Sequence, residues 1–502
     1  MSITRHLARH GAERPHAPAL TCEGESLTHG AVAALVQRIA ARFQDAPEGG
    51  IALDLPNGAA LAVLFLAAAH AGREGQVLDP SWPAGQRADI LARIRPGLLV
   101  SCGVDGDVRL SPTQGLAGLA EAMGAGTTQM IEPPHPDLSF PDPSFPDLPF
   151  YVGFTSGSTG LPKGYRRAHR SWTESFDADT REFGIGPDDV LLAPGALTHS
   201  LFLYALARGL DAGAHVILTK SFRPRAVADL ARRHQASVLC GVPTQLALLL
   251  DHLAAEGATL DQVRLVLCSG AKWPAGRKAL LSRHLPKAGF AEFYGASELS
   301  FITVAKGDER VPEGSVGRAF DGVRLSIRDR AGRRLPVGRT GLVFVESPFL
   351  FLDYATGDSP DLMRHGPEIS VGDMGRLDAA GFLTLAGRAK RMIVTSGKNL
   401  YPEEVERQLE LHPAVAAAAV LGVPDGKRGE RLVAFIQPQE RAHEGGGQVT
   451  RADLVAWLRP RLALFKVPRL YARVARWPLT ASGKTDFAAV ARLWPHGCEL
   501  IP

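Results

Sequence analysis

Residues 155–164 combine glycines, hydroxyl side chains and one lysine in a run of ten, Thr-Ser-Gly-Ser-Thr-Gly-Leu-Pro-Lys-Gly. The glycines let the backbone turn so that its N–H groups point inward, and the hydroxyls and the Lys163 ammonium add further donors. Such a loop can surround the oxygens of a phosphate group. It follows an apolar stretch at residues 150–154, which predicts a strand directly before it. Its spacing differs from the GxxxxGK[ST] pattern of P-loop ATPases, so we expect a phosphate-binding loop of another kind.

Short apolar runs alternate with segments of helical periodicity along most of the chain. The leucines at 246, 249, 250 and 253, for example, share one helix face just after the apolar run that ends near residue 241. Alternating strands and helices predict parallel sheets covered by helices, an α/β architecture. Expected strands lie at residues 50–55, 98–101, 190–193, 215–218, 237–240 and 265–268.

Other segments have different patterns. Residues 133–149 are rich in proline and repeat Ser-Phe-Pro-Asp at positions 139 and 144, which predicts an extended connector. Between roughly 310 and 390, short apolar runs separated by glycine turns predict antiparallel sheet. The remainder predicts a separate small α+β unit with an exposed loop at residues 444–448.

The composition is that of an ordinary globular protein. The 502 residues are 45% hydrophobic and 22% charged, which excludes a disordered chain and predicts about two to four domains. No apolar stretch approaches the roughly 20 residues of a membrane-spanning helix, and no apolar core follows the basic N-terminal residues, so we expect neither a membrane span nor a secretory signal. The five cysteines show no CxxC spacing, which argues against a disulfide framework or a thiolate zinc site and favours a reducing, cytoplasmic location.

The charge is unevenly distributed. A net charge of +4 is too small to predict nucleic-acid binding. From Arg388 onward, 18 basic and 11 acidic side chains give a net charge of +7, against −3 for the residues before it. Two interpretations are open: a solvated basic surface, or a small domain that meets a polyanion such as a nucleotide.

The ten-residue loop resembles the signature loop of the acyl-adenylate-forming superfamily, which comprises acyl-CoA synthetases, adenylation domains of peptide synthetases and beetle luciferases. Further segments resemble the family's motifs in the family's order: Tyr-Gly-Ala-Ser-Glu at 294–298, Gly-Asp-Met-Gly at 372–375, Gly-Arg-Ala-Lys at 387–390, Asn-Leu-Tyr-Pro-Glu-Glu at 399–404 and Pro-Leu-Thr-Ala-Ser-Gly-Lys at 478–484. The resemblance spans nearly the whole chain, and the chain looks most like an acyl-CoA synthetase.

The resemblance implies a fold and a reaction. The fold has a large N-terminal domain (residues 1–389) of parallel-sheet α/β subdomains with a small β-barrel-like subdomain, and a small mobile α+β C-terminal domain (residues 390–502). In the reaction, a carboxylate attacks the α-phosphate of ATP, pyrophosphate leaves, and the acyl-AMP reacts with a thiol. The protein supplies mainly positioning and charge neutralisation. The implied cofactors are ATP, Mg²⁺ and coenzyme A.

The resemblance also assigns roles to individual residues. Asp373 accepts hydrogen bonds from the two ribose hydroxyls, Glu298 binds Mg²⁺, and Lys390 is the hinge about which the small domain rotates. The implied catalytic residues are Lys163, His199, Glu298 and Lys484. The implied nucleotide-binding residues are Thr155, Ser156, Gly157, Ser158, Thr159, Gly160, Lys163, Gly270, Ala271, Tyr294, Gly295, Ser297, Asp373, Arg388 and Lys484.

Each segment also has a plainer interpretation. A glycine- and serine-rich turn alone is more often an ordinary loop. Ser297 and Glu298 would fit a helix cap beside a solvated carboxylate. Tyr294 would equally fit a hydrophobic core, and Lys484 a solvated surface. The occurrence of these motifs in the family's order favours the functional interpretation of all of them.

Two positions depart from the family's pattern. Lys390 is followed by Arg391, where the family commonly has an acidic residue. The frequent Gly-Gly before the Asn-x-Tyr-Pro segment reads Ser396-Gly397. By the resemblance, that backbone borders the thiol channel, so this change bears on the second half-reaction and the identity of the thiol, whereas adenylation is untouched.

The segment around His199 would line the pocket for the acid. Residues 190–210 contain no Asp or Glu, so the ammonium group of an amino acid would lack a partner, at a cost of several kcal/mol. An amino-acid substrate is therefore not expected. Residues 201–204 (Leu-Phe-Leu-Tyr) suit an aliphatic or aryl tail, although a core helix would look alike. For Lys272 we expect an ammonium that reaches solvent over apolar surface rather than one that pairs with the substrate.

Three functions remain open at this point. The first is a carboxylate–CoA ligase. The second is a stand-alone adenylating enzyme that loads the phosphopantetheine thiol of an acyl carrier protein. The third is a nucleotide-binding pseudoenzyme, against which the joint presence of Lys163, Glu298, Asp373, Arg388 and Lys484 argues. We expect a monomer or a homodimer with no nucleic-acid partner.

Overall fold

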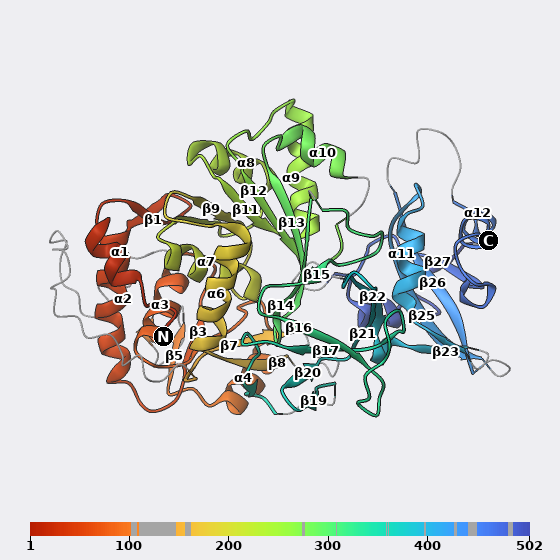
Figure 1. Cartoon of the computed structure of the whole chain (residues 1–502), viewed down its shortest axis with the longest axis horizontal. Coiled ribbons are helices and arrows are strands. Elements are labelled where there is room, and N and C mark those ends of the chain that lie inside the picture. Colours follow the sequence, from red (N-terminus) through yellow and green to blue (C-terminus); the bar gives the residue numbers. More distant parts are fainter. Residues whose placement is uncertain are drawn as a thin grey trace. The chain divides into compact units, whose positions relative to one another are not determined.

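The chain forms two compact units (Figure 1). The computed structural model describes residues 1–101, 108–109, 147–155, 162–273, 277–307, 309–357, 359, 361–395, 398–425, 429–439, 449–479 and 485–501. The first unit comprises Met1–Leu325, Val345–Pro360 and Pro367–Ile369, and the second comprises Ser326–Phe344, Asp361–Gly366 and Ser370–Pro502. The expected boundary at residue 389 stays a prediction. Residues 133–146 of the predicted connector and the loop at 444–448 lie outside the described residues.

A nine-stranded sheet forms the larger part of the first unit. Its order is β15-β14-β13-β12-β11-β9-β10-β1-β2. Strands β1, β10, β9, β11, β12 and β13 run parallel, and β2, β14 and β15 are antiparallel additions at the edges. The bounds are β1 Pro18–Cys22, β2 Glu25–Thr28, β9 Val190–Ala193, β10 His215–Leu218, β11 Val238–Gly241, β12 Leu265–Ser269, β13 Gly289–Ala296, β14 Ser300–Lys306 and β15 Arg318–Ala319.

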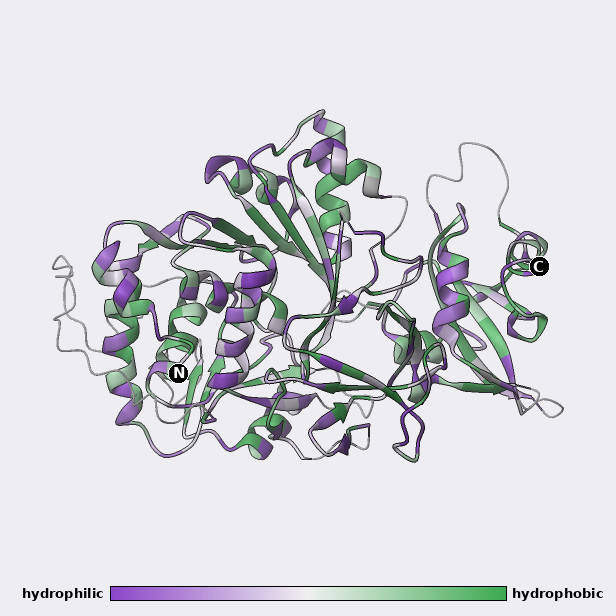
Figure 2. Cartoon of the chain, in the orientation of Figure 1, coloured by the Kyte–Doolittle hydropathy of each residue, from purple (hydrophilic) through white to green (hydrophobic). Residues whose placement is uncertain are grey.

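Helices cover this sheet because each presents an apolar face to it. In α9 (Pro243–Glu256), Leu246, Leu249, Leu250 and Leu253 are all buried, as the leucine spacing predicts. They pack with buried residues of β11 and β12 in one hydrophobic cluster. Figure 2 shows these strands as mainly hydrophobic and the outer surfaces of the helices as mixed. The other helices of the first unit are α1 Leu7–Glu13, α2 His29–Gln44, α3 Ala59–His70, α4 Ala84–Ile94, α6 His169–Phe183, α7 Ser200–Ala212, α8 Pro224–Arg233 and α10 Lys278–His284.

A seven-stranded sheet completes the first unit. Its order is β18-β8-β7-β4-β3-β5-β6, with parallel pairing from β7 to β6 and antiparallel pairing of β7 with β8 and of β8 with β18. Helix α3 is buried almost all round, which explains why its sequence is apolar on every face. The bounds are β3 Ile51–Asp54, β4 Gly75–Val77, β5 Leu98–Ser101, β6 Val108–Arg109, β7 Pro149–Thr155, β8 Lys163–Ala168 and β18 Asp353–Tyr354.

A six-stranded sheet lies mostly in the second unit. Its central order is β19-β20-β17-β21-β22, with β16 paired to β17. The pairings of β17 with β20 and β21, and of β21 with β22, are antiparallel, as the glycine turns of this region predict. The bounds are β16 Arg324–Arg328, β17 Gly341–Glu346, β19 Met363–His365, β20 Glu368–Ser370, β21 Asp373–Leu377 and β22 Leu383–Arg388.

The C-terminal part of the second unit is an α+β module. Its sheet has the order β24-β23-β26-β27-β28, with the long β25 paired to β26. A 3₁₀ helix, η2 (Ala389–Arg391), leads into it from β22. The bounds are β23 Ile393–Thr395, β24 Lys398–Leu400, β25 Val415–Asp425, β26 Gly429–Pro438, β27 Leu470–Arg473, β28 Glu499–Leu500, α11 Pro402–Glu410, α12 Arg451–Leu458, η4 Leu464–Lys466 and α13 Phe487–Arg492.

The α/β class predicted from the sequence is confirmed. All six expected strands are present, each within one or two residues of the expected limits. Cys240 and Cys268 are buried, as their position in apolar runs predicts. In the part of the chain that the structure describes, we find no helix with the length and apolarity needed to cross a membrane.

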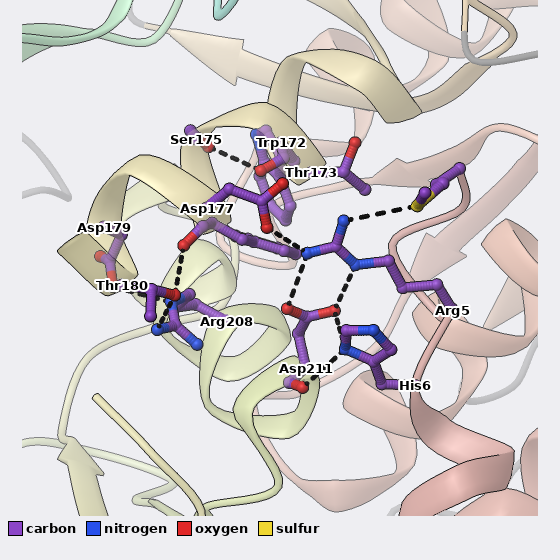
Figure 3. A network of polar contacts seen from close by, with 12 residues as sticks. Arg5, His6, Trp172, Thr173, Ser175, Asp177, Asp179, Thr180, Arg208 and Asp211 are labelled. Atoms are coloured by element: carbon purple, nitrogen blue, oxygen red, sulfur yellow. Dashed lines mark hydrogen bonds and ion pairs between the residues drawn. The ribbon is translucent and has the colours of Figure 1, made fainter. Parts of the chain in front are cut away.

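Buried ion pairs hold the C-terminal half of helix α7 in place (Figure 3). The Arg208 guanidinium donates to Asp179 Oδ1 of α6 at 2.7 Å, and both side chains are only 2% exposed. Burial raises the pKa of Asp179 to about 6, although Arg208 favours its charged form. Nearby, Arg5 binds both Asp211 of α7 and Asp177 of α6. Helix α7 is therefore fixed at its C-terminal end, while at its other end Ser200 Oγ lies 3.4 Å from Ser297 Oγ, a residue of the site described below.

We predict that Arg208→Met destabilises the fold by about 3–5 kcal/mol, because the charge of Asp179 would stay buried without its partner. The free energy of unfolding in urea measures this change. The double variant Arg208→Met/Asp179→Leu removes both charges and should recover most of the loss. A double variant as unstable as the single one would mean that the ion pair is not the source of the stability.

Candidate active site

Several predicted site residues follow the carboxyl ends of neighbouring parallel strands. Such an edge is where open α/β sheets usually bind ligands. His199 comes shortly after β9 and precedes the first turn of α7, where it is half-buried. Gly270 and Ala271 follow β12 and are exposed, and Gly270 has φ +98°, a conformation that favours glycine. Tyr294 lies near the end of β13 and is half-buried. The sheet order therefore brings these four residues to one edge.

A tight turn after β13 carries Ser297 and Glu298. The β13–β14 ladder has a register shift at Tyr294/Gly295, and a Cβ at Gly295 would overlap the carbonyl oxygen of Ser300. The position therefore requires glycine. The helix cap that the plainer interpretation offers for Ser297 and Glu298 is wrong, because these residues belong to a turn between two strands.

The buried guanidinium of Arg167, on β8, holds this turn. It donates through Nε and Nη2 to the Ser297 carbonyl at 3.2 and 2.6 Å, and through Nη1 to the Phe349 carbonyl at 2.6 Å. Burial lowers the pKa of Arg167, while nearby hydroxyls and the carboxylate of Glu298 oppose that shift. The side chain of Glu298 is 9% exposed, and its Oε1 accepts a hydrogen bond from the Tyr354 hydroxyl at 2.8 Å.

The predicted phosphate loop connects two antiparallel strands. Thr155 ends β7 and pairs with Lys163 at the start of β8, so the loop lies at the tip of a hairpin. The expected strand before the loop is confirmed. Lys163 Nζ donates to Ser359 Oγ at 2.6 Å, and Gly164 N donates to Thr356 Oγ1 at 2.8 Å. The loop residues Ser156, Gly157, Ser158, Thr159 and Gly160, and also Lys484, lie outside the described residues.

Asp373 and Arg388 lie side by side in the second unit. They are register partners in the β21–β22 ladder, and Arg388 Nε lies 3.0 Å from Asp373 Oδ1. The Asp373 side chain is 10% exposed and that of Arg388 is 50% exposed. This geometry presents one carboxylate and one guanidinium together at the end of a hairpin. Such a pair can accept hydrogen bonds from vicinal hydroxyls on one side and donate on the other.

The predicted hinge lies in the 3₁₀ turn η2. Lys390 Nζ is 3.5 Å from Asp361 Oδ2, and both side chains are partly exposed. Arg391, the departure from the family's pattern, is anchored more firmly. It binds Glu403 at 3.0 Å and Glu406 at 2.6 Å, and its guanidinium stacks on the Phe487 ring at 3.6 Å. The other departure, Ser396-Gly397, lies outside the described residues.

The expectation for Lys272 is wrong. Its ammonium does not simply reach solvent: it donates to Glu292 Oε2 at 2.7 Å and to the Ser315 carbonyl at 2.7 Å. The other oxygen of Glu292 accepts the backbone N–H of Trp273 at 2.6 Å. Glu292 is two residues before Tyr294 on β13, so this clamp fixes the loop that carries Gly270 and Ala271. Sequence alone offered no signal for the pairing, because the two residues are 20 positions apart in different elements.

Sequence reasoning missed Arg167, Tyr354 and Ser359. Arg167 is four residues after Lys163 on the same strand, and the strand period of two would place both on one face. That signal was available for Arg167. Tyr354 and Ser359 reach the site only because β18 pairs with β8 across a long sequence separation, which no local pattern predicts.

Comparison with known proteins agrees with the fold. Residues 7–355 match the family described as AMP-binding enzyme, and residues 404–484 match the one described as AMP-binding enzyme C-terminal domain. The chain therefore belongs to the AMP-binding enzyme family, which confirms the predicted resemblance.

Individual relatives cover nearly the whole chain. An uncharacterized acyl–CoA ligase of Bacillus subtilis (strain 168) is 36% identical over 488 residues, with 96% of each chain covered. A feruloyl-CoA synthase of an Amycolatopsis species is 30% identical, with 94% of each chain covered. The crystal structure of ATP-bound MatB from Rhodopseudomonas palustris is 24% identical and covers 99% of both chains with a TM-score of 0.82, so the two proteins share a fold.

We predict that Asp373→Ala weakens ATP binding at least tenfold. Each hydrogen bond from a ribose hydroxyl to the carboxylate is worth about 1.5–3 kcal/mol, and 1.4 kcal/mol corresponds to about a factor of ten. Isothermal titration calorimetry with ATP measures the change. Arg376→Ala, which alters an exposed side chain on the same strand, is the matched control. Unchanged affinity in Asp373→Ala would contradict the ribose assignment.

Proposed function

We propose that this chain activates a carboxylic acid with an uncharged aliphatic or aryl tail, and that the residues described above each have a distinct role in adenylation. The reaction class is that of an AMP-forming acyl-CoA ligase: ATP and a carboxylate give acyl-AMP and pyrophosphate, and coenzyme A then displaces AMP to give the thioester. The residue assignment rests mainly on one observation in the first unit. The buried Arg167, on the strand that begins with Lys163, binds the turn that carries Ser297 and Glu298.

The phosphate end of ATP is assigned to the β7–β8 hairpin. Lys163 holds the β- and γ-phosphates and stabilises the departing pyrophosphate, and the backbone and hydroxyls of residues 155–160 add neutral donors. Ser297 contacts the α-phosphate. During the displacement, negative charge builds up on the pyrophosphate as its bond to the α-phosphorus breaks. These donors stabilise that charge, so they lower the activation barrier of adenylation and do more than bind the nucleotide.

Glu298 is the proposed protein ligand for Mg²⁺. The described residues contain no group of three or more His, Cys, Asp or Glu side chains that could hold a metal ion. A single buried carboxylate still fits Mg²⁺, which is commonly bound by one or two carboxylates together with the phosphates of a substrate. When bound, the ion neutralises phosphate charge during displacement. The chain's own contribution is the orientation of one carboxylate.

The nucleoside and the second half-reaction are assigned to the second unit. Asp373 and Arg388 hold the ribose, and the adenine-stacking role that the resemblance implies for Tyr294 stays a prediction. Lys484 bridges the substrate carboxylate and ATP during adenylation, so it acts only in one orientation of the small domain. The small domain then rotates about Lys390, so that Lys484 leaves the active site and the thiol of coenzyme A can enter it. The net charge of +7 in this region suits both ATP and coenzyme A.

The tail of the acid is assigned to the apolar region around a cavity of about 20 Å³, which has room for about one water molecule, so the lining side chains must move apart to admit the tail. The cavity lining includes Leu201, Tyr204 and Ala205 of α7, together with Leu267, Phe293 and Phe301. Asp179 and Arg208 also border it, but they neutralise each other as an ion pair. Neither the cavity nor residues 190–210 therefore provide an unpaired carboxylate for an α-ammonium group. This favours an apolar acid over an amino acid.

We expect pyrophosphate release with hexanoate and 3-phenylpropanoate to exceed that with their α-amino analogues, norleucine and phenylalanine, by at least about 100-fold. A buried cation without a partner costs about 3–5 kcal/mol, which corresponds to that factor or more. A coupled pyrophosphate assay on this panel is the test. Equal turnover of an acid and its α-amino analogue would contradict the proposed pocket, and no release with any acid would contradict the proposed function.

The acceptor is tested with the same acids. Product from the best acid is analysed by mass spectrometry with coenzyme A and, separately, with holo acyl carrier proteins. We expect the CoA thioester. Acylation of a carrier protein with no CoA thioester would assign the chain to the carrier-loading alternative.

The two half-reactions should respond to different substitutions. Lys484→Ala should lose acid-dependent pyrophosphate exchange by about 10²–10³, since it removes one electrostatic donor from a developing anion, but should retain acyl transfer from supplied acyl-AMP to coenzyme A. Lys390→Pro should retain the exchange and lose the transfer, because proline fixes φ at the hinge. Lys390→Ala, which removes the Asp361 contact but leaves φ free, is the control. Equal loss of both half-reactions in both variants would contradict the rotation.

A further inference from the structure

Tyr354 contacts both charged groups of the proposed metal–phosphate site. Its hydroxyl donates to Glu298 Oε1 at 2.8 Å, and its ring centroid is 5.9 Å from the Lys163 ammonium. The second distance is within the roughly 6 Å over which a cation is attracted to an aromatic face. Tyr354 is therefore placed between the carboxylate assigned to the metal and the ammonium assigned to the phosphates.

The position of Tyr354 is fixed by the fold. It is 8% exposed and pairs with Tyr165 in the ladder between β18 and β8. Its ring packs edge-on against Phe351, with centroids 5.0 Å apart. Its hydroxyl is therefore delivered to Glu298 by a strand and a packed ring rather than by a mobile loop.

The segment after Tyr354 also holds the loop's lysine end. Thr356 accepts the Gly164 N–H at 2.8 Å, and Ser359 accepts from Lys163 Nζ at 2.6 Å. Both residues come shortly after the end of β18. One short segment thus orients the base of the phosphate loop and, through Tyr354, the carboxylate opposite it.

We propose that Tyr354 is a positioning residue that orients the Glu298 carboxylate for the metal ion and, through its ring face, the Lys163 ammonium for the phosphates. The proposal rests on the roles given above to Glu298 and Lys163. Among the described residues no group of three or more His, Cys, Asp or Glu could hold the ion, so the orientation of the one proposed carboxylate ligand matters for metal binding. Partners that orient a metal ligand typically change metal affinity by about 10- to 100-fold when they are removed.

Two substitutions separate the two contacts. Tyr354→Phe removes the hydroxyl and keeps the ring, whereas Tyr354→Leu removes both. The full-length protein is mixed with α,β-methylene ATP, which cannot be cleaved at the reacting bond, and titrated with Mn²⁺ while free Mn²⁺ is measured by electron paramagnetic resonance. Binding of the same analogue in EDTA is measured by calorimetry. Tyr471→Phe removes another buried hydroxyl, in the C-terminal module, and serves as the matched control.

We expect Tyr354→Phe to weaken Mn²⁺ binding about tenfold or more, with the melting temperature and the metal-free affinity for the analogue close to wild type. Tyr354→Leu should weaken Mn²⁺ binding as much and should also lower the metal-free affinity, since the ring face beside Lys163 is lost. Tyr471→Phe should match wild type in both assays.

Three results would overturn the proposal. Wild-type Mn²⁺ affinity in Tyr354→Phe would show that the hydroxyl does not orient the ligand. An equal loss of Mn²⁺ and metal-free nucleotide binding in Tyr354→Phe would indicate general disruption of the site. Glu298→Gln is measured in parallel. Wild-type Mn²⁺ affinity in this variant would show that Glu298 is not the metal ligand, and it would contradict that part of the proposed function. Weak Mn²⁺ binding in Glu298→Gln with an unaffected Tyr354→Phe overturns the role of Tyr354 alone.

Discussion

The buried guanidinium of Arg167 is the constraint on which the proposed site depends. It lies on β8 of the seven-stranded sheet and donates to the carbonyl of Ser297, in the β13–β14 turn of the nine-stranded sheet. A buried charge is costly unless it is fully hydrogen-bonded and compensated, and here two backbone carbonyls and the nearby Glu298 meet that requirement. The strand that begins with Lys163 is thereby joined to the turn that carries Glu298. The two sheets are thereby linked at the point where the lysine proposed to bind phosphate and the carboxylate proposed to bind the metal ion lie.

The arrangement of the chain's functional groups follows from where rigid elements end. Lys163 begins a strand, Ser297 and Glu298 occupy a turn that glycine at 295 permits, and Asp373 begins a strand whose ladder partner is Arg388. Each group is thus set by hydrogen-bonded backbone, which limits its freedom without burying it away from a ligand.

Local patterns predicted the fold class and the strands that carry several proposed site residues, and they failed where a side chain's partner is distant in sequence. The strand limits, the leucine face of α9 and the hairpin strand before the phosphate loop were all predictable, because period and glycine position are local properties. The pairing of Lys272 with Glu292 was not, since both residues read individually as solvated charges. Tyr354 was missed for the same reason: an aromatic residue beside a turn carries no sign of the strand pairing that directs it to Glu298. The roles of individual residues came from resemblance to a family, not from spacing.

Lys390 and Arg391 are adjacent but are held with very different strength. The Lys390–Asp361 contact is 3.5 Å long between partly exposed groups, and contacts of that kind contribute about 0–1 kcal/mol. Arg391 is 16% exposed, makes ion pairs with two glutamates of α11 and stacks on a ring of α13, so losing it would leave Glu406 buried without its partner. From Arg391 onward the chain is therefore held firmly to α11 and α13, whereas before Lys390 the Arg388 N–H makes a longer hydrogen bond to Glu403 Oε1, at 3.3 Å. A change in φ and ψ at Lys390 would break the Lys390–Asp361 contact and the Arg388–Glu403 hydrogen bond but keep the ion pairs of Arg391. The basic residue at 391 is therefore compatible with the proposed hinge at 390, even though it departs from the family's usual acidic residue.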